Sequence, residues 1–174
     1  EEIALGTKWN DLAFKNSFYV LYPNQKPKRH PQNCWVWYDP KNQEPQNSEA
    51  AEIIGMIGEV KTKYNIDTTQ IYVAGMSSGG ATTSILLSCF PKYFAGGAIH
   101  SGLPYGVAQS AQEAWEVTKK GPESKPHYGS CEPKNYQNKL MVIHGLKDPL
   151  VNVKNPDRIL SDFSNAKRVN YYIE

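Results

Sequence analysis

The chain lacks any apolar run near the roughly 18 residues that a membrane-spanning helix needs, so we expect no transmembrane segment. It also carries little net charge, because 19 Lys and Arg residues against 17 Asp and Glu residues leave +2. The densest basic stretch, residues 26–30, lies among prolines, which is typical of a solvated loop and argues against a nucleic-acid partner. No signal peptide is recognisable, and we interpret the start at Glu1 as a mature or trimmed N-terminus.

Cysteine is scarce and odd in number, since only Cys34, Cys89 and Cys131 are present. If the protein is exported, one of them lacks a partner within this chain. A buried core thiol is one interpretation of Cys89, which follows an apolar helical stretch, whereas Cys34 and Cys131 lie in loop-like segments that a disulfide could staple. The His, Cys and Asp residues show no metal-ligand spacing, so we expect no metal and no organic cofactor.

Helical and strand patterns alternate along the 174 residues, and the 40% apolar content is ordinary for one globular domain. Such alternation predicts an α/β fold with a mostly parallel sheet and helices on both faces. We expect helices at residues 7–16, at 48–64, from Ser77 to near Pro91, around 109–118 and at 156–163. We expect strands at Ser17–Tyr22, 71–74, 96–100, 139–144 and 168–173.

Two long segments interrupt this alternation. Residues 24–47 are polar and proline-rich except for an aromatic cluster that includes Trp35 and Trp37, and a loop of this length is usually functional. The two tryptophans either pack the loop or line a substrate cleft, since rigid aromatic rings bury much area. The second segment, about residues 103–138, has weak periodicity and is interpreted as an inserted loop or lid.

The motif Gly75-Met-Ser77-Ser78-Gly79 follows an apolar strand pattern and opens a helix pattern. This is the context of the nucleophile elbow, in which a sharp turn projects a serine hydroxyl at the N-terminus of a helix. Ser77 is therefore the candidate nucleophile, and the backbone N–H of Ser78 is a candidate oxyanion donor. The alternatives are a plain strand-to-helix turn or a phosphate loop, but no Lys-Ser/Thr follows to complete the latter.

Asp148 lies just after the strand predicted at residues 139–144. The carboxyl ends of parallel strands share one edge of a sheet, so Asp148 is expected at the same edge as Ser77. We interpret it as the acid that orients a catalytic histidine, the alternative being a residue that caps the turn before Pro149.

No histidine follows Asp148, although the triad order on this fold is Ser, acid, His. We interpret His144 as ordering the acid's loop by hydrogen bonding. The other histidines, His30, His100 and His127, are interpreted as structural. We therefore expect a chain truncated at both ends, lacking the strand that precedes the first helix and the segment beyond Glu174 that carries the histidine.

The sequence resembles the esterase, polyhydroxybutyrate depolymerase family, which is close to the feruloyl and acetylxylan esterases of the first carbohydrate-esterase family. The resemblance rests on Tyr72–Ala81, Phe90-Pro91, Phe94-Ala95, His100–Gly106, Trp9, Phe18–Pro23, Asn33–Trp37 and His144–Asp148. It implies an α/β-hydrolase fold, with residues 1–174 a partial catalytic domain, Ser77 as nucleophile and Asp148 as triad acid. The family's oxyanion loop precedes the first helix, and a cysteine there would pair with Cys34, which favours a secreted or periplasmic protein.

The expected activity is hydrolysis of a small or polymeric ester through a Ser-His-Asp triad. Polyhydroxyalkanoate oligomers and feruloyl or acetyl esters of plant polysaccharides both remain open as substrates. A catalytically inactive binding module with the same fold is the alternative, supported by the missing histidine. A peptidase or an acyltransferase is a third interpretation.

Overall fold

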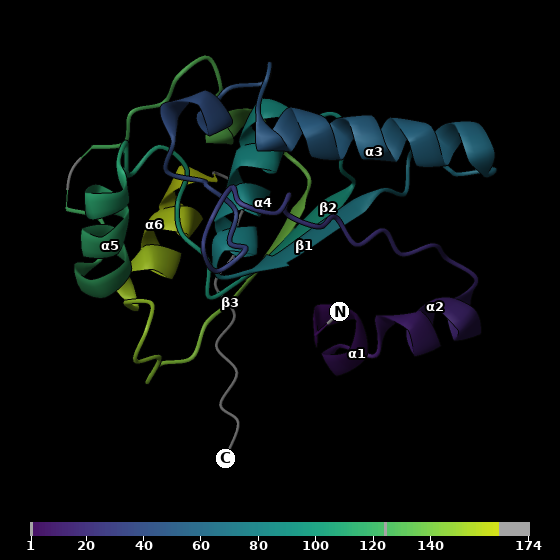
Figure 1. The fold of residues 1–174 in the computed structure, drawn as a ribbon, viewed down its shortest axis with the longest axis horizontal. Coiled ribbons are helices and arrows are strands. Elements are labelled where there is room, and N and C mark those ends of the chain that lie inside the picture. The colour runs from purple at the N-terminus through teal and green to yellow at the C-terminus, as the bar shows by residue number, and fades with distance from the viewer. Residues whose placement is uncertain (1, 124, 164–174) are drawn as a thin grey trace.

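The computed structural model describes residues 2–123 and 125–163 (Figure 1). The helices are α1 (Glu2–Gly6), α2 (Trp9–Asn16), α3 (Glu49–Lys63), α4 (Ser78–Cys89), α5 (Ala111–Lys120) and α6 (Lys154–Asp162). Short 3-10 turns follow at η1 (Pro40–Gln43) and η2 (Pro133–Asn135), and the strands are β1 (Tyr72–Met76), β2 (Gly96–His100) and β3 (Lys139–Ile143). Within the described residues, the predicted alternation of helices and strands is confirmed from α3 onward.

The three strands form one parallel sheet in the order β1-β2-β3. At their carboxyl ends the register aligns Met76 with His100, and His100 with Ile143. Helix α4 connects β1 to β2, and the segment that contains α5 connects β2 to β3. All three carboxyl ends therefore lie at one edge of the sheet, where parallel α/β sheets place ligands.

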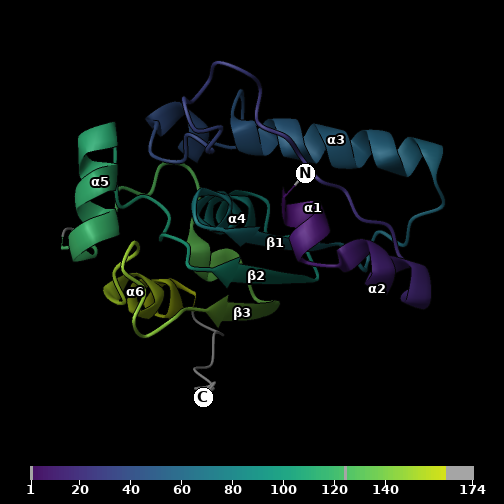
Figure 2. The same cartoon turned by 60° about the horizontal axis from the view of Figure 1, so that its bottom comes forward.

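Helix α4 packs directly on one face of this sheet, and α3 lies beyond it on the same side (Figure 2). The side chains of Ile85, Leu86 and Leu87 on α4 are buried and form the centre of the core. Helix α3 begins where the sequence predicts it, because the Ser48 hydroxyl accepts a hydrogen bond from the Ala51 N–H at 3.1 Å. The core thus holds α4 rigidly between the sheet and α3.

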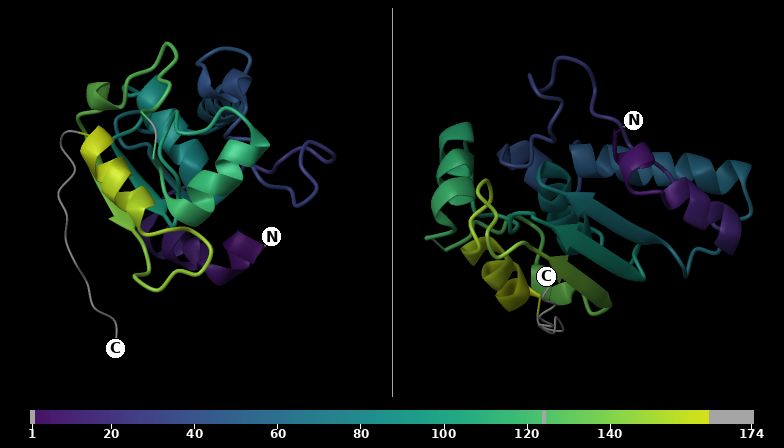
Figure 3. Two further views of the ribbon diagram at one scale, coloured as in Figure 1. Left: turned by 90° about the vertical axis from the view of Figure 1, so that its left-hand side faces the viewer. Right: turned by 90° about the horizontal axis from the view of Figure 1, so that it is seen from below.

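Helices α1 and α2 lie on the opposite side of the sheet (Figure 3). There Trp9 joins Tyr72, Ala98 and Met141 around a shallow, mostly apolar pocket of about 270 Å³. Met141 keeps 60% of its surface exposed, so α2 covers this face only in part. The predicted placement of helices on both faces is therefore confirmed, with most of the core on the α4 side.

The strand predicted at Ser17–Tyr22 is wrong. These residues form no strand, and Phe18, Tyr19 and Leu21 are 43%, 60% and 40% exposed. Ser17 ends α2 in a left-handed conformation, with φ at 55°. A strand needs a neighbour to receive its hydrogen bonds, and the apolar run has none among the strands of the described residues. The strand predicted at residues 168–173 lies outside the described residues.

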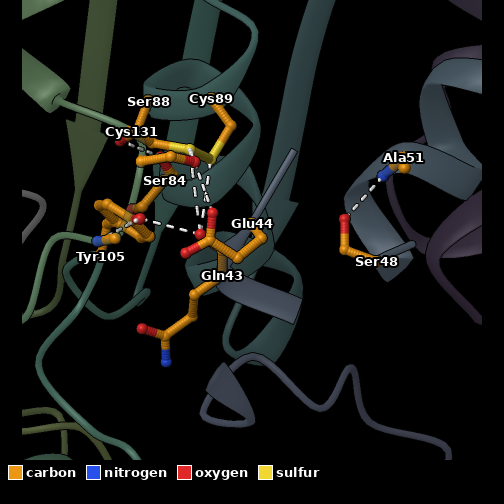
Figure 4. Close-up of a disulfide and its surroundings, with 11 residues drawn as sticks. Gln43, Glu44, Ser48, Ala51, Ser84, Ser88, Cys89, Tyr105 and Cys131 are labelled. Atoms are coloured by element: carbon orange, nitrogen blue, oxygen red, sulfur yellow. Dashed lines mark hydrogen bonds between the residues drawn. A yellow bond between two sulfur atoms is a disulfide. The ribbon is translucent and has the colours of Figure 1, made fainter. Parts of the chain in front are cut away.

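The interpretation of Cys89 as a core thiol is also wrong, because Cys89 forms a disulfide with Cys131 (Figure 4). The bond joins the end of α4 to the segment between β2 and β3, in which the predicted helix is confirmed as α5. The Gln43 carbonyl oxygen lies 3.7 and 3.9 Å from the two sulfur atoms and accepts a hydrogen bond from the Tyr105 hydroxyl at 2.8 Å. Gln43 thereby ties residues 24–47 to both α4 and the insert.

Candidate active site

Ser77 occupies a strained turn at the carboxyl end of β1. Its φ of 54° and ψ of −121° lie in a region that residues other than glycine rarely adopt. The Ser77 N–H donates to the His100 carbonyl at 3.0 Å, and the Ser77 carbonyl accepts the N–H of Ala81 at 3.0 Å. The backbone is thus fixed on both sides of a serine that is itself exposed, which is the geometry predicted from the motif.

Two glycines close to Ser77, Gly75 and Gly80, have no room for a side chain. A Cβ at Gly75 would lie 2.1 Å from the carbonyl oxygen of Gly79, and a Cβ at Gly80 would lie 2.8 Å from the Cα of Gly102. Only glycine permits such close approach of one backbone to another. This turn therefore requires Gly75 and Gly80, whereas a Cβ at Gly79, the second glycine of the motif, would come no closer than 3.8 Å to its nearest neighbour.

Ser78 is the first residue of α4, where the N–H groups of the first turn have no partners within the helix. These N–H groups and the helix dipole favour an anion near Ser77. The Ser78 hydroxyl accepts a hydrogen bond from the Trp35 N–H at 3.3 Å. Trp35 therefore lies beside the elbow, and its ring atoms Cδ1 and Nε1 are 3.8 and 3.9 Å from the position of a Cβ on Gly79.

Trp37 lies elsewhere. Its side chain is 7% exposed in the hydrophobic core and makes an edge-to-face contact with Tyr38, with the ring centroids 5.8 Å apart. Of the two predicted tryptophans, the structure brings only Trp35 to the elbow. The sequence does not reveal which tryptophan is buried, because both rings are equally apolar.

Asp148 lies in the loop after β3, at the same sheet edge as Ser77, with β2 between the two strands that carry them. Its Oδ1 accepts hydrogen bonds from the N–H groups of Leu150 at 2.9 Å and Val151 at 3.0 Å. The bond from Val151 is the main cause that lowers the pKa of Asp148, and partial burial opposes it. Smaller contributions come from Leu150, the Ser101 side chain and the charge of His144. These donors stabilise the carboxylate form.

His144 orders this loop, as the sequence predicts. Its Nε2 lies 2.9 Å from the Val151 carbonyl and 3.7 Å from Asp148 Oδ2, and its side chain is 6% exposed. His144 therefore supports the loop that carries Asp148.

Among residues 2–123 and 125–163, no cluster of three or more His, Cys, Asp or Glu side chains is suited to hold a metal ion. No helix in the same residues is long and apolar enough to cross a bilayer.

Ser101, which directly follows β2, lies near the candidate site and was not singled out from the sequence. Its φ is 44°, and its side chain is one of the smaller causes that lower the pKa of Asp148. The sequence signal for Ser101 is the stretch Ser101-Gly-Leu-Pro-Tyr-Gly106, which belongs to the family resemblance but does not indicate a role for the serine.

A parallel sheet with a strained serine at the strand-to-helix turn and an aspartate after a later strand defines the α/β-hydrolase class. The family model described as "Esterase PHB depolymerase" matches residues 1–174, so the chain belongs to that family.

Named relatives agree with this assignment. The chain is 29% identical over 164 residues to poly(3-hydroxyalkanoate) depolymerase C of Paucimonas lemoignei, covering 90% of this chain and 40% of that protein. It is 27% identical over 174 residues to feruloyl esterase B of Thermothelomyces thermophilus, covering 92% of this chain and 59% of that protein. The chain thus spans about half the length of these relatives.

Among solved structures, the acetyl xylan esterase from Aspergillus awamori superimposes with a TM-score of 0.69 at 20% identity. The match covers 84% of this chain and 57% of that one. It confirms the predicted fold class.

Proposed function

We propose that the protein containing this chain is a serine carboxylic-ester hydrolase, with residues 1–174 part of its single catalytic domain. The observation that carries the proposal is the backbone of Ser77, whose φ of 54° holds an exposed hydroxyl at the N-terminus of α4. A turn that only connected β1 to α4 would have no need of this strained conformation at a serine. Membership of a family of esterases and depolymerases supports the same function.

In the proposed reaction, the Ser77 hydroxyl attacks the ester carbonyl carbon and gives its proton to a histidine that is not among the four of this chain. The carbonyl oxygen becomes an oxyanion, which the Ser78 N–H stabilises at the start of α4. The tetrahedral intermediate expels the alcohol, which takes the proton from the histidine. Water then attacks the acyl-enzyme by the same route and releases the acid.

Asp148 holds that histidine in the right tautomer and stabilises its imidazolium form. Its own loop supports this role, because the N–H groups of Leu150 and Val151 keep the carboxylate ionised and fix one of its oxygens. Oδ2 lies on the side of His144 at 3.7 Å, which is longer than a hydrogen bond. The carboxylate therefore retains capacity to accept a bond from a catalytic histidine.

The substrate is an ester of a hydroxyalkanoate oligomer, or a feruloyl or acetyl ester of a polysaccharide, as the names of the relatives suggest. In this proposal Trp35, which lies beside Ser78, forms one wall of the substrate cleft, whereas Trp37 is a core residue. The proposed insert or lid at about residues 103–138 is joined to the end of α4 by the disulfide Cys89–Cys131. A disulfide fits an exported protein, secreted or periplasmic.

Labelling with a fluorophosphonate probe tests the proposal. The full-length protein should gain one covalent adduct, and Ser77→Ala should abolish it. Ser161→Ala is the matched control, since Ser161 is exposed on α6 and only bonds the Arg158 carbonyl. Absence of any adduct on the full-length protein, with no ester hydrolysis, would reject the proposal and favour a hydrolase-fold binding module.

A further inference from the structure

The loop that follows β3 and carries Asp148 is bonded to the carboxyl end of α5. The last carbonyl groups of a helix have no partners within it, and three of those in α5 accept donors from residues 152–155. The Asn152 N–H donates to the Thr118 carbonyl at 2.8 Å, and the Asn152 side-chain amide donates to the Lys119 carbonyl at 3.1 Å. The fully buried Asn155 side chain donates to the Val117 carbonyl at 3.1 Å.

Asn152 also helps to begin the next helix. Its side-chain oxygen accepts the N–H of Lys154, the first residue of α6, at 3.0 Å. Its backbone carbonyl accepts a hydrogen bond from the Asn155 side-chain amide at 3.0 Å. The backbone and side chain of this single residue therefore join the end of α5 to the start of α6, and the two helices lie side by side (Figure 2).

The residue before Asn152 binds the acid. Val151 is buried, and its N–H donates to Asp148 Oδ1 at 3.0 Å. Only the two dihedral angles of Val151 separate this N–H from that of Asn152, so the bonds made by Asn152 restrict where the Val151 N–H can point. Helix α5 reaches the same loop a second time, because Lys119 Nζ donates to the Pro149 carbonyl at 3.4 Å.

We propose that Asn152 is a positioning residue for Asp148: it bonds the acid's loop to α5 and α6, and thereby holds the Val151 N–H in place to bind the Asp148 carboxylate. Helix α5 then serves as a support for the acid. This inference rests on the proposed function, because it assumes that Asp148 orients the catalytic histidine. Asn152 acts through Val151 and does not itself contact the substrate.

Two substitutions at Asn152 separate its contacts. Asn152→Ala removes the side-chain bonds to both helices, whereas Asn152→Asp keeps the acceptor for the Lys154 N–H and loses only the donor to the Lys119 carbonyl. Asn138→Ala is the matched control. Asn138 precedes β3, at the opposite edge of the sheet, and its side-chain amide likewise donates to a backbone carbonyl, that of Phe94, at 2.9 Å.

The full-length protein and these variants are compared by Tm, and by kcat and KM on 4-nitrophenyl acetate well below the Tm of each variant. If Asn152 positions Asp148, kcat falls about tenfold in both Asn152 variants and KM stays within about twofold, whereas Asn138→Ala keeps its kcat even if its Tm falls. In Asn152→Ala the acid limb of kcat/KM also moves to lower pH, because a displaced carboxylate stabilises the imidazolium form of the histidine less.

Two results would overturn the inference. If Asn152→Ala lowers Tm but keeps its kcat, as expected of the control, its bonds are only structural. If Asn152→Asp keeps the wild-type kcat while Asn152→Ala loses it, the contact with α6 matters and α5 does not support the acid.

The failure of the proposed function gives a different result. In that case the wild-type protein itself would not hydrolyse the ester, or Ser77→Ala would retain full activity, and the inference would fall with it.

Discussion

The backbone N–H of Trp35 donates a hydrogen bond to the Ser78 hydroxyl at 3.3 Å, across 43 positions of sequence. This contact brings the loop of residues 24–47 to the residue that follows the candidate nucleophile. The next residue of the loop is anchored to α3, because the Glu49 side chain accepts the N–H of Val36 at 2.8 Å. The aromatic wall of the proposed cleft is therefore attached both to the elbow and to the start of α3.

Trp35→Ala should affect bulky substrates most. Because the ring lies against Gly79, its loss removes apolar surface beside Ser77 that an aromatic acyl group would cover. We expect KM for a feruloyl ester to rise about tenfold, and KM for an acetyl ester to change by less than about threefold. Steady-state kinetics on the two esters checks this, and equal changes on both would contradict a role for Trp35 in recognition.

Trp37→Ala should behave differently, as a change in the core. The side chain is 7% exposed, so truncation leaves a cavity and should lower the free energy of unfolding by about 3–5 kcal/mol. Urea denaturation measures this loss, with Trp115→Ala as the matched control because Trp115 is 64% exposed on α5. Similar losses for both variants would show that Trp37 is not a core residue.

The disulfide between Cys89 and Cys131 should stabilise the fold. It closes a loop with a sequence separation of 42, and its loss should cost about 2–4 kcal/mol. Replacing both cysteines with serine and measuring thermal unfolding tests this. Ser161→Ala is the control, since Ser161 is exposed on α6 and far in sequence from both cysteines. If the double variant unfolds at the same temperature as the wild type, the disulfide contributes nothing to stability.

Glu52 should make stability depend on pH in the acidic range. Its carboxylate binds Arg29 at 2.7 and 2.8 Å and Lys26 at 2.8 Å, and the hydrogen bonds from Arg29 and then Lys26 lower its pKa from 4.5 to about 2. A carboxylate whose pKa is lowered by folding stabilises the fold fully when the pH is above its pKa in the unfolded chain. This stabilisation is lost as the pH falls from 4.5 to about 2.

Accordingly, Glu52→Gln should be less stable than the wild type at neutral pH, and the difference should shrink as the pH falls through that window. Glu59→Gln provides the control, because Glu59 is 78% exposed and only pairs with Lys63 at 4.0 Å. A difference in Tm between the wild type and Glu52→Gln that stays constant from neutral pH down to the lower end of that window would contradict this account.

Much of the fold could be predicted because its signals are local. The Ser48 cap and the apolar stripe through Ala50 and Ile53 define α3 within a few residues of sequence. The glycines around Ser77 likewise report a turn whose close contacts lie mostly within the motif itself. Local patterns of this kind require no knowledge of the rest of the chain.

The parts that could not be predicted depend on partners distant in sequence. The run at Ser17–Tyr22 has strand composition, but composition cannot show whether a neighbouring strand is there to pair with it. Cys89 follows an apolar helical stretch and packs against the core, so its sequence suggests a core thiol. Only the fold brings Cys131 close enough to form the disulfide. Likewise, the sequence shows neither the φ of 44° at Ser101 nor the contribution of its side chain to the lowered pKa of Asp148.

The most direct test of the central claim is to trap the acyl-enzyme. The full-length protein is quenched with acid during turnover of 4-nitrophenyl butyrate, digested, and the modified residue located by fragment-ion mass spectrometry. The account predicts a butyryl group on Ser77, and none after Ser77→Ala. A butyryl group on another residue, or turnover with no acylated protein under conditions where deacylation limits the rate, would contradict it.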